Sequence, residues 1–223
     1  MVELTSNPPS GGRSHAGLVR PVLVSSLLFM LVTGLAYPLA TTGVANLLFP
    51  TQAGGNLIAS HGKAVGSEVI GQDFQRPDYF HPRPSATLGA DPAAPDKTID
   101  QPYNAASSGA SNLGPTSKKL VDQVTARVAA YRHDNALATD APVPVDAVTA
   151  SGSGLDPDIS VANARLQAPR VARLRKLPLE RVQQLVASQT TPRQLGLLGE
   201  PRVNVLRLNL ALDALSSPAS TTR

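Results

Sequence analysis

The sequence predicts an α+β protein in which one N-terminal transmembrane helix is followed by a single extracytoplasmic domain with a small sheet and several helices. Three observations predict this class. Residues 21–62 carry no Asp, Glu, Lys or Arg, apolar residues recur at helical spacing after residue 117, and short alternating stretches typical of strands lie before and after those helices. Hydrophobic residues make up 42% of the chain but aromatic ones only 4%, so the core must be built from Val, Leu, Ile and Ala.

The apolar stretch 22–40 has the length of a membrane-spanning helix, which needs ~20 largely apolar residues. Arg13 and Arg20 precede it in a short tail, and Lys or Arg in such a tail favours the cytoplasmic side. Pro38 lies near the end of the stretch, where a helix tolerates a kink or an end best. We therefore expect a disordered cytoplasmic tail over 1–19 and a transmembrane helix with its exit over 20–48.

A cleaved signal peptide is the main alternative for the same stretch. A basic start, an apolar middle and the small residues Gly34 and Ala36 fit a cleavage site. Against cleavage, apolar residues continue as far as Phe49. Cleavage would release an exported soluble binding protein or enzyme that begins near residue 37.

The extracytoplasmic domain is expected over residues 51–215. Residues 61–72 predict one or two strands, and the long segment 73–116 is rich in Pro, Gly, Ser, Asp and Asn. A segment of that length without regular structure is usually functional or ordered by a partner. Ser117 can cap a helix over 118–132, in which apolar residues recur every four positions.

The second half of the domain alternates between strand and helix patterns. Residues 142–150 predict a short strand, and 203–212 a strand that could be central to the sheet. Three more helices are expected, each beginning at a capping residue or a proline: 160–175 after Ser160, 179–186 after Pro178, and a short helix from Thr191-Pro192. Residues 216–223 are expected to form a disordered tail.

Composition and charge exclude several classes of function. The chain has no cysteine, which excludes disulfides, thiol catalysis and cysteine-based zinc sites. The net charge is +4, and nucleic-acid binding would need clustered basic residues with aromatic residues between them. The densest basic cluster instead predicts a solvated helix face: Arg165, Arg170, Arg173, Arg175, Lys176 and Arg181.

Catalytic motifs are weak. Asp96-Lys97-Thr98 matches the start of the D-K-T-G-T sequence that P-type ATPases phosphorylate, but Ile99 replaces the glycine, so we take the match as chance. A stand-alone phosphoryl-transfer protein using Asp96 is the rival hypothesis. The sequence has no phosphate-binding loop and no G-x-S-x-G motif, and its histidines lack metal-ligand spacing. Asp156 and Asp158 predict a turn that helps to start the helix capped by Ser160.

Several blocks together resemble the C subunit (KdpC) of the Kdp potassium-transporting P-type ATPase. They occur in the same order as in that family and span most of the chain. The blocks are residues 34–43 with 48–50, 66–72, 79–85, 111–115, 144–160 and 198–213.

The resemblance implies an accessory subunit without catalytic or metal-binding residues of its own, in the inner membrane of a bacterium. Its implied partners are a channel-like potassium-binding subunit, a P-type ATP-hydrolysing subunit, a small accessory membrane peptide and the lipid bilayer, but no nucleic acid. The complex would use ATP and potassium, whereas no cofactor is expected on this chain. The implied role is to assemble or stabilise the complex, and to act as a catalytic chaperone that raises the ATP affinity of the ATP-hydrolysing subunit.

Two sets of residues are candidates for contacts. Small and hydroxyl residues of the span allow close helix approach in lipid, and these are Ser25, Ser26, Thr33 and Gly34. The family blocks supply Arg83, Ser85, Asn112, Gly114, Asp156, Asn204 and Asn209. We expect the charged and amide members of this second set to be buried groups that satisfy loop backbones. Direct contact with a partner is the alternative.

Overall fold

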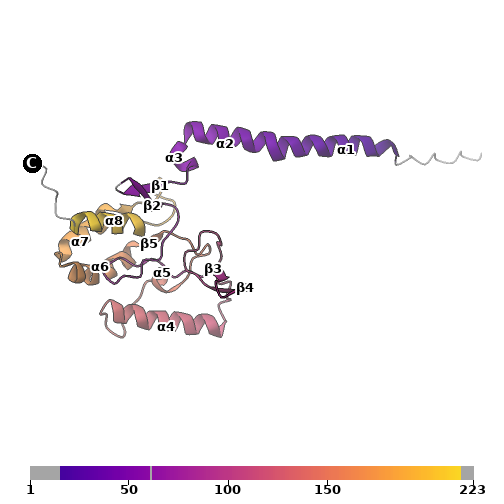
Figure 1. The fold of residues 1–223 in the computed structure, drawn as a ribbon. Helices are drawn as coiled ribbons and strands as arrows, with labels where there is room; N and C mark the ends of the chain where they lie inside the picture. Colours follow the sequence, from indigo (N-terminus) through magenta and orange to yellow (C-terminus); the bar gives the residue numbers. More distant parts are fainter. Residues whose placement is uncertain (1–15, 61, 217–223) are drawn as a thin grey trace, which may run out of the picture. The chain divides into compact units, whose positions relative to one another are not determined.

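The structure is a computed structural model that describes residues 16–60 and 62–216. The chain divides into two compact units, residues 1–54 and 55–223, which are described separately below. The predicted tails, 1–19 and 216–223, lie mostly outside the described residues. An α+β chain with one long N-terminal apolar helix and a domain of helices and small sheets confirms the predicted fold class (Figure 1).

The first unit is a long helix that contains one wide turn. Helix α1 (Ala16–Leu31) passes through the π-helical turn η1 (Val32–Ala36) into α2 (Tyr37–Leu48), and the short α3 (Pro50–Ala53) follows. The stretch Gly17–Leu48 is long and apolar enough to cross a membrane. It does not end at Pro38. In the wide turn the N–H of Tyr37 donates to the carbonyl of Val32, which accommodates a proline that lacks an N–H of its own.

Two antiparallel hairpins begin the second unit. Strand β1 (Leu57–Ser60) pairs with β2 (Lys63–Ser67), so the strand prediction for 61–72 is correct only for its first part. Strand β3 (Leu88–Asp91) pairs with β4 (Ala94–Asp100). This second hairpin lies inside the segment that was expected to be irregular. Its strands were not predicted, because the Gly-, Asp- and Pro-rich sequence lacks the usual strand formers.

A three-stranded antiparallel sheet has the order β5 (Asp158–Ser160), β7 (Arg202–Asn204) and β6 (Thr190–Thr191). The central place expected for the strand at 203–212 is thus correct, but its length is wrong, because the chain turns into helix α8 (Val205–Ser216). Val205, Leu208 and Leu212 are buried at helical spacing, a pattern that competes with alternation in the same residues. The helix predicted from Thr191-Pro192 is also wrong, since strand β6 occupies its start.

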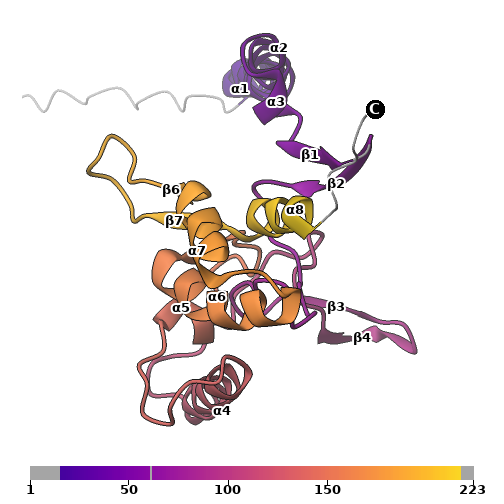
Figure 2. The ribbon, with the colours of Figure 1, turned by 90° about the vertical axis from the view of Figure 1, so that its left-hand side faces the viewer.

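Helices α6 (Val161–Arg175), α7 (Leu179–Ser188) and α8 surround the core of the domain, whereas α4 (Lys118–Asp134) lies at its periphery and has no buried residue (Figures 1 and 2). The predicted helices 118–132, 160–175 and 179–186 are confirmed. The strand predicted at 142–150 is wrong, because α5 (Val145–Val148) forms one helical turn there. The largest buried apolar side chains are Phe80, Ile159, Val171, Val182, Val186, Val203, Leu208 and Leu212.

Candidate functional site

Residues 73–85 form an irregular segment whose backbone is bonded by side chains. The N–H of Phe80 donates to Asn209 Oδ1 at 2.9 Å, and Asn209 Nδ2 donates back to the Phe80 carbonyl at 3.0 Å. Gln167 binds the backbone of His81 in the same way, at 2.7 and 3.0 Å. The two amides thus take the place that a neighbouring strand would occupy, and they fix this segment against α8 and α6.

Two arginines of α6 also bind the backbone of segment 73–85. The Arg170 side chain is buried, and its guanidinium donates to the carbonyls of Pro77 and Tyr79 and to the side chains of Asn135 and Gln167. Arg175 donates to the Asp78 carbonyl at 2.9 Å and lies over the Tyr79 ring. The prediction that this basic cluster forms a solvated face is therefore wrong for Arg170 and Arg175, because segment 73–85 covers them.

The structure brings Arg83, Ser85 and Asp156 together from distant parts of the sequence. Arg83 Nη1 lies 2.6 Å from Asp156 Oδ2, and Ser85 Oγ donates to the carbonyl of Gly154 at 2.7 Å. Gly154 has φ +69°, and a Cβ there would lie 2.5 Å from the Thr87 methyl group, so only glycine fits this crossing of loops. These side chains join the segment ending at Ser85 to the loop that leads into β5.

Asp156 and Asp158 have separate roles. Asp156 Oδ1 accepts from the N–H of Asp158 and forms the predicted turn, whereas the Asp158 carboxylate lies 2.9 Å from Arg202 Nε across the sheet. Burial raises the pKa of Asp158, and the nearby Arg202 opposes that rise. The start of α6 is organised mainly by Asp146, whose carboxylate accepts from the backbone and hydroxyl of Ser160, both at 2.8 Å.

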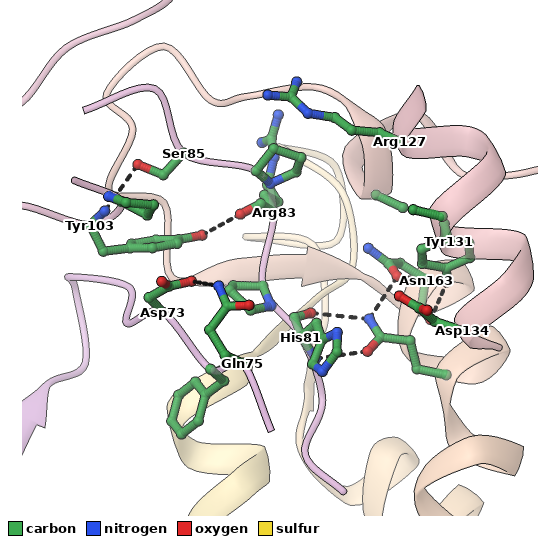
Figure 3. Close-up of a pocket in the computed structure, with 17 residues that line it drawn as sticks. Asp73, Gln75, His81, Arg83, Ser85, Tyr103, Arg127, Tyr131, Asp134 and Asn163 are labelled. Carbon is green, nitrogen blue, oxygen red and sulfur yellow. Dashed lines mark hydrogen bonds between the residues drawn. The ribbon is translucent and has the colours of Figure 1, made fainter. Parts of the chain in front are cut away.

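A cavity of about 370 Å³ opens between segment 73–85 and helix α4 (Figure 3). Its labelled lining includes His81, Arg83, Tyr103, Arg127 and Tyr131 (Figure 3). The Tyr103 hydroxyl donates to the carbonyl of Arg83 at 2.7 Å, and the Tyr131 hydroxyl donates to Asn163 Oδ1 at 2.9 Å. The two phenols therefore tie the walls of the cavity together.

The surroundings of three cavity residues, His81, Tyr103 and Tyr131, favour the neutral forms of their side chains. Burial lowers the pKa of His81, and the charge of Arg170 lowers it further. Burial raises the pKa of Tyr103 and Tyr131, so both phenols stay protonated at neutral pH. Both hydroxyls already donate to groups of the fold, so the two phenols serve as polar walls of the cavity.

The remaining predicted residues are dispersed. Asn204 caps α8, since its Oδ1 accepts from the N–H of Arg207, and its amide group donates to the Glu68 carbonyl. Asn112 was expected to be buried but is exposed, and its backbone has φ 51°. Gly114 is also exposed, and its carbonyl accepts from the N–H of Ser117. Ser117 occupies the cap position of α4 but makes no capping bond with its side chain.

In the span, two candidate hydroxyls bond to their own helix. Ser25 donates to the Val22 carbonyl and Thr33 donates to the Phe29 carbonyl. The side chain of Ser26 and the backbone of Gly34 are exposed beside them. A hydroxyl that is already bonded can lie against another helix in lipid without leaving an unpaired donor.

Sequence reasoning missed three residues that shape the site: Asp146, Gln167 and Arg170. Gln167 and Arg170 lie on the same face of α6 as Ala164, Ala168 and Val171, all of them buried. The sequence signal that could have found them is a polar residue at a core-facing position of a helix, which indicates a buried hydrogen-bond network. Asp96, the rival phosphorylation candidate, lies exposed on β4. Among the residues that the structure describes, no group of three His, Asp or Glu side chains could hold a metal ion.

Comparison with known proteins confirms the resemblance. The family model for KdpC, described as the c chain of the K+-transporting ATPase, matches residues 19–214. The potassium-transporting ATPase KdpC subunit of Methylobacterium nodulans is 58% identical over 198 residues, which cover 89% of this chain and 97% of the relative. The KdpC subunit of Bradyrhizobium diazoefficiens is also 58% identical, over 87% of this chain and 96% of the relative. The chain therefore belongs to the KdpC family of accessory subunits of potassium-transporting ATPases.

Proposed function

We propose that this chain assembles and stabilises a high-affinity, ATP-driven potassium uptake complex as its single-pass accessory subunit. One observation carries the proposal. The apolar helix Gly17–Leu48 has no buried side chain, and the domain that follows uses its buried polar groups to hold its own backbone. An apolar helix of this length is stable only against lipid or other spans. Such a chain is suited to holding partners together.

The proposed place is the bacterial inner membrane, with the N-terminus in the cytoplasm and the C-terminal domain outside it. The support is the charge pattern, because Arg13 and Arg20 precede the span and Lys63 is the first charged residue after it. The proposed partners are the channel-like potassium-binding subunit, the P-type ATP-hydrolysing subunit and the small accessory peptide. ATP and potassium would be used by the complex, not bound by this chain.

A second, finer role is an increase in the ATP affinity of the ATP-hydrolysing subunit, as the family resemblance implies. With the domain outside the cytoplasm, the effect would pass through the partner subunits and not through a nucleotide site on this chain. The KM for ATP of the complex should rise when this chain is depleted, with a smaller change in kcat. An unchanged KM in the depleted complex would remove this role and leave assembly alone.

The first experiment is an affinity purification of the full chain in mild detergent from potassium-starved cells. We expect a P-type ATPase and a channel-like membrane protein in the eluate, together with ATP hydrolysis that potassium stimulates. A chain that purifies alone without detergent and begins near residue 37 would contradict the proposal. That result would favour the exported soluble protein.

A further inference from the structure

Three exposed leucines lie within four residues on the connection between β6 and β7. We call residues 192–200 the leucine loop. The exposed fractions are 91% for Leu195, 81% for Leu197 and 59% for Leu198. Figure 2 shows this connection leaving the body of the domain. Elsewhere in the described part of the domain, exposed large apolar side chains occur singly along the chain. Such a concentration on a projecting loop marks an interaction site more often than chance.

Backbone hydrogen bonds and an ion pair support the leucine loop although it is exposed. Gln194 and Leu198 exchange two backbone hydrogen bonds of 2.9 Å, and Arg193 pairs with Glu200 at the base of the loop. Leu195 has φ 54°, a left-handed conformation that leucine rarely adopts. A bonded turn that places a leucine in an unfavoured conformation at full exposure is already ordered for binding, which lowers the entropy lost on association.

The surroundings of the leucine loop are polar and electrically balanced. A second cavity, of about 290 Å³, lies where the loop leaves the sheet, and its lining includes Thr191 and Arg202. Its two carboxylates are both paired, Asp158 with Arg202 and Glu68 with Arg207. An apolar tip beside a polar border of paired charges has the anatomy of a protein–protein interface.

We propose that the leucine loop inserts into an apolar pocket on another protein chain of the potassium-transporting ATPase. This inference rests on the proposed function. A bilayer surface is disfavoured, because the loop carries no aromatic residue and its Arg193 is already paired with Glu200. A second copy of this chain is disfavoured, because outside the loop no element or hairpin of the described domain carries more than two exposed large apolar side chains, too few to receive three leucines.

Photo-crosslinking tests which molecule covers the leucine loop. Leu197→p-benzoylphenylalanine is introduced into the full chain in cells that make the whole complex, with Val145→p-benzoylphenylalanine as the matched control at a 73% exposed site on α5. We expect an adduct with another ATPase chain at position 197 but not at 145. An adduct with lipid or with a second copy, equal adducts at both positions, or no adduct at 197 would overturn the inference.

A double variant measures the contribution of the side chains. Leu195→Gln with Leu197→Gln should keep the unfolding midpoint of the wild type but lower recovery of the other ATPase chains by about tenfold or more, since two buried leucines are lost. The control is Val121→Gln with Val145→Gln, two exposed sites on α4 and α5. Full recovery with the leucine variant would overturn only the inference. If the wild type recovers no ATPase chain, the proposed function fails, and the inference with it.

Discussion

At the scale of single residues, side chains make the backbone hydrogen bonds of segment 73–85 that a neighbouring strand would otherwise make. Asn209 and Gln167 each bind both backbone groups of one residue in segment 73–85, and Arg170 binds two carbonyls of the same segment. Sequence reasoning expected buried polar groups of this kind at Asn209 but missed those of α6. The reason is physical: a helix propensity or a hydrophobic pattern does not say which backbone a polar side chain will meet.

Asn209→Ala should destabilise the domain by about 2 to 4 kcal/mol, because the N–H and the carbonyl of buried Phe80 both lose their partner. The measurement is denaturant unfolding of the full chain in mild detergent, followed by tyrosine fluorescence. Gln183→Ala, at an exposed site of α7, should stay within about 0.5 kcal/mol of the wild type. Equal effects of the two variants would show that Asn209 is not the support of segment 73–85.

His81 should make the domain sensitive to acid. Its folded pKa is lowered below the ordinary value of 6.5 by burial and by Arg170, so the unfolded chain binds the proton more readily. The stability that neutral His81 contributes is therefore complete above pH 6.5 and is lost as the pH falls through the lower, folded pKa. His81→Gln should show a smaller loss of unfolding free energy between about pH 7.5 and about pH 5.

The control for this pH dependence is His133→Gln, whose side chain is exposed, and which should keep the wild-type slope. If wild type and His81→Gln lose stability in parallel, another group is responsible for the acid sensitivity.

At the scale of elements, caps and periods were each right in some places and wrong in others. Ser160 begins α6 as expected, because its hydroxyl accepts from the N–H of Asn163 at 3.0 Å. The strand expected at 203–212 is mostly helix α8, because its alternating leucines also fit helical spacing. The turn α5 escaped prediction because its four residues are too few to reveal a period, and the hairpin β3–β4 escaped it because its sequence lacks the usual strand formers.

Asp146 should be the main support of the junction between α5, β5 and α6. It accepts bonds from the N–H and hydroxyl of Ser160 and from Asn163 Nδ2. Asp146→Ala should therefore lower the unfolding free energy by about 2 to 4 kcal/mol, and Ser160→Ala by about 1 kcal/mol. The double variant should cost less than the sum of the two, because both remove the same bonds.

Asp140→Ala is the matched control for this junction, since Asp140 is an exposed aspartate of the preceding loop. It should change the unfolding free energy by no more than about 0.5 kcal/mol. Strictly additive losses for Asp146→Ala and Ser160→Ala would mean that the two side chains act independently.

At the scale of the whole molecule, the sequence was informative about family and class and less so about the site. The apolar span with the helical and alternating residue patterns was enough to predict the α+β class, and the ordered blocks were enough to predict the KdpC family. The cavity between segment 73–85 and α4 was not foreseen, because it is formed by residues more than 80 positions apart, such as His81 and Gln167. The exposure of the leucine loop was not predicted either, since the sequence alone does not distinguish an exposed leucine from a buried one.

The side of the membrane on which the domain lies is the last prediction, and it decides how the chain can affect ATP use. The chain has no cysteine, so a single introduced cysteine is the only thiol in the chain that a maleimide can label. Val145→Cys in intact cells should react with a membrane-impermeant maleimide, because this exposed position would face the outside. Ser10→Cys, in the N-terminal tail, should react only after lysis.

The opposite labelling pattern would place the domain in the cytoplasm and allow direct contact between this chain and a nucleotide. Loss of the Ser10→Cys label even after lysis, with the Val145→Cys label retained, would mean that the N-terminal segment is removed. With the expected pattern, any effect of the domain on ATP affinity must cross the membrane through the spans of the complex. The exposed helix Gly17–Leu48 is then the part of this chain that can transmit it.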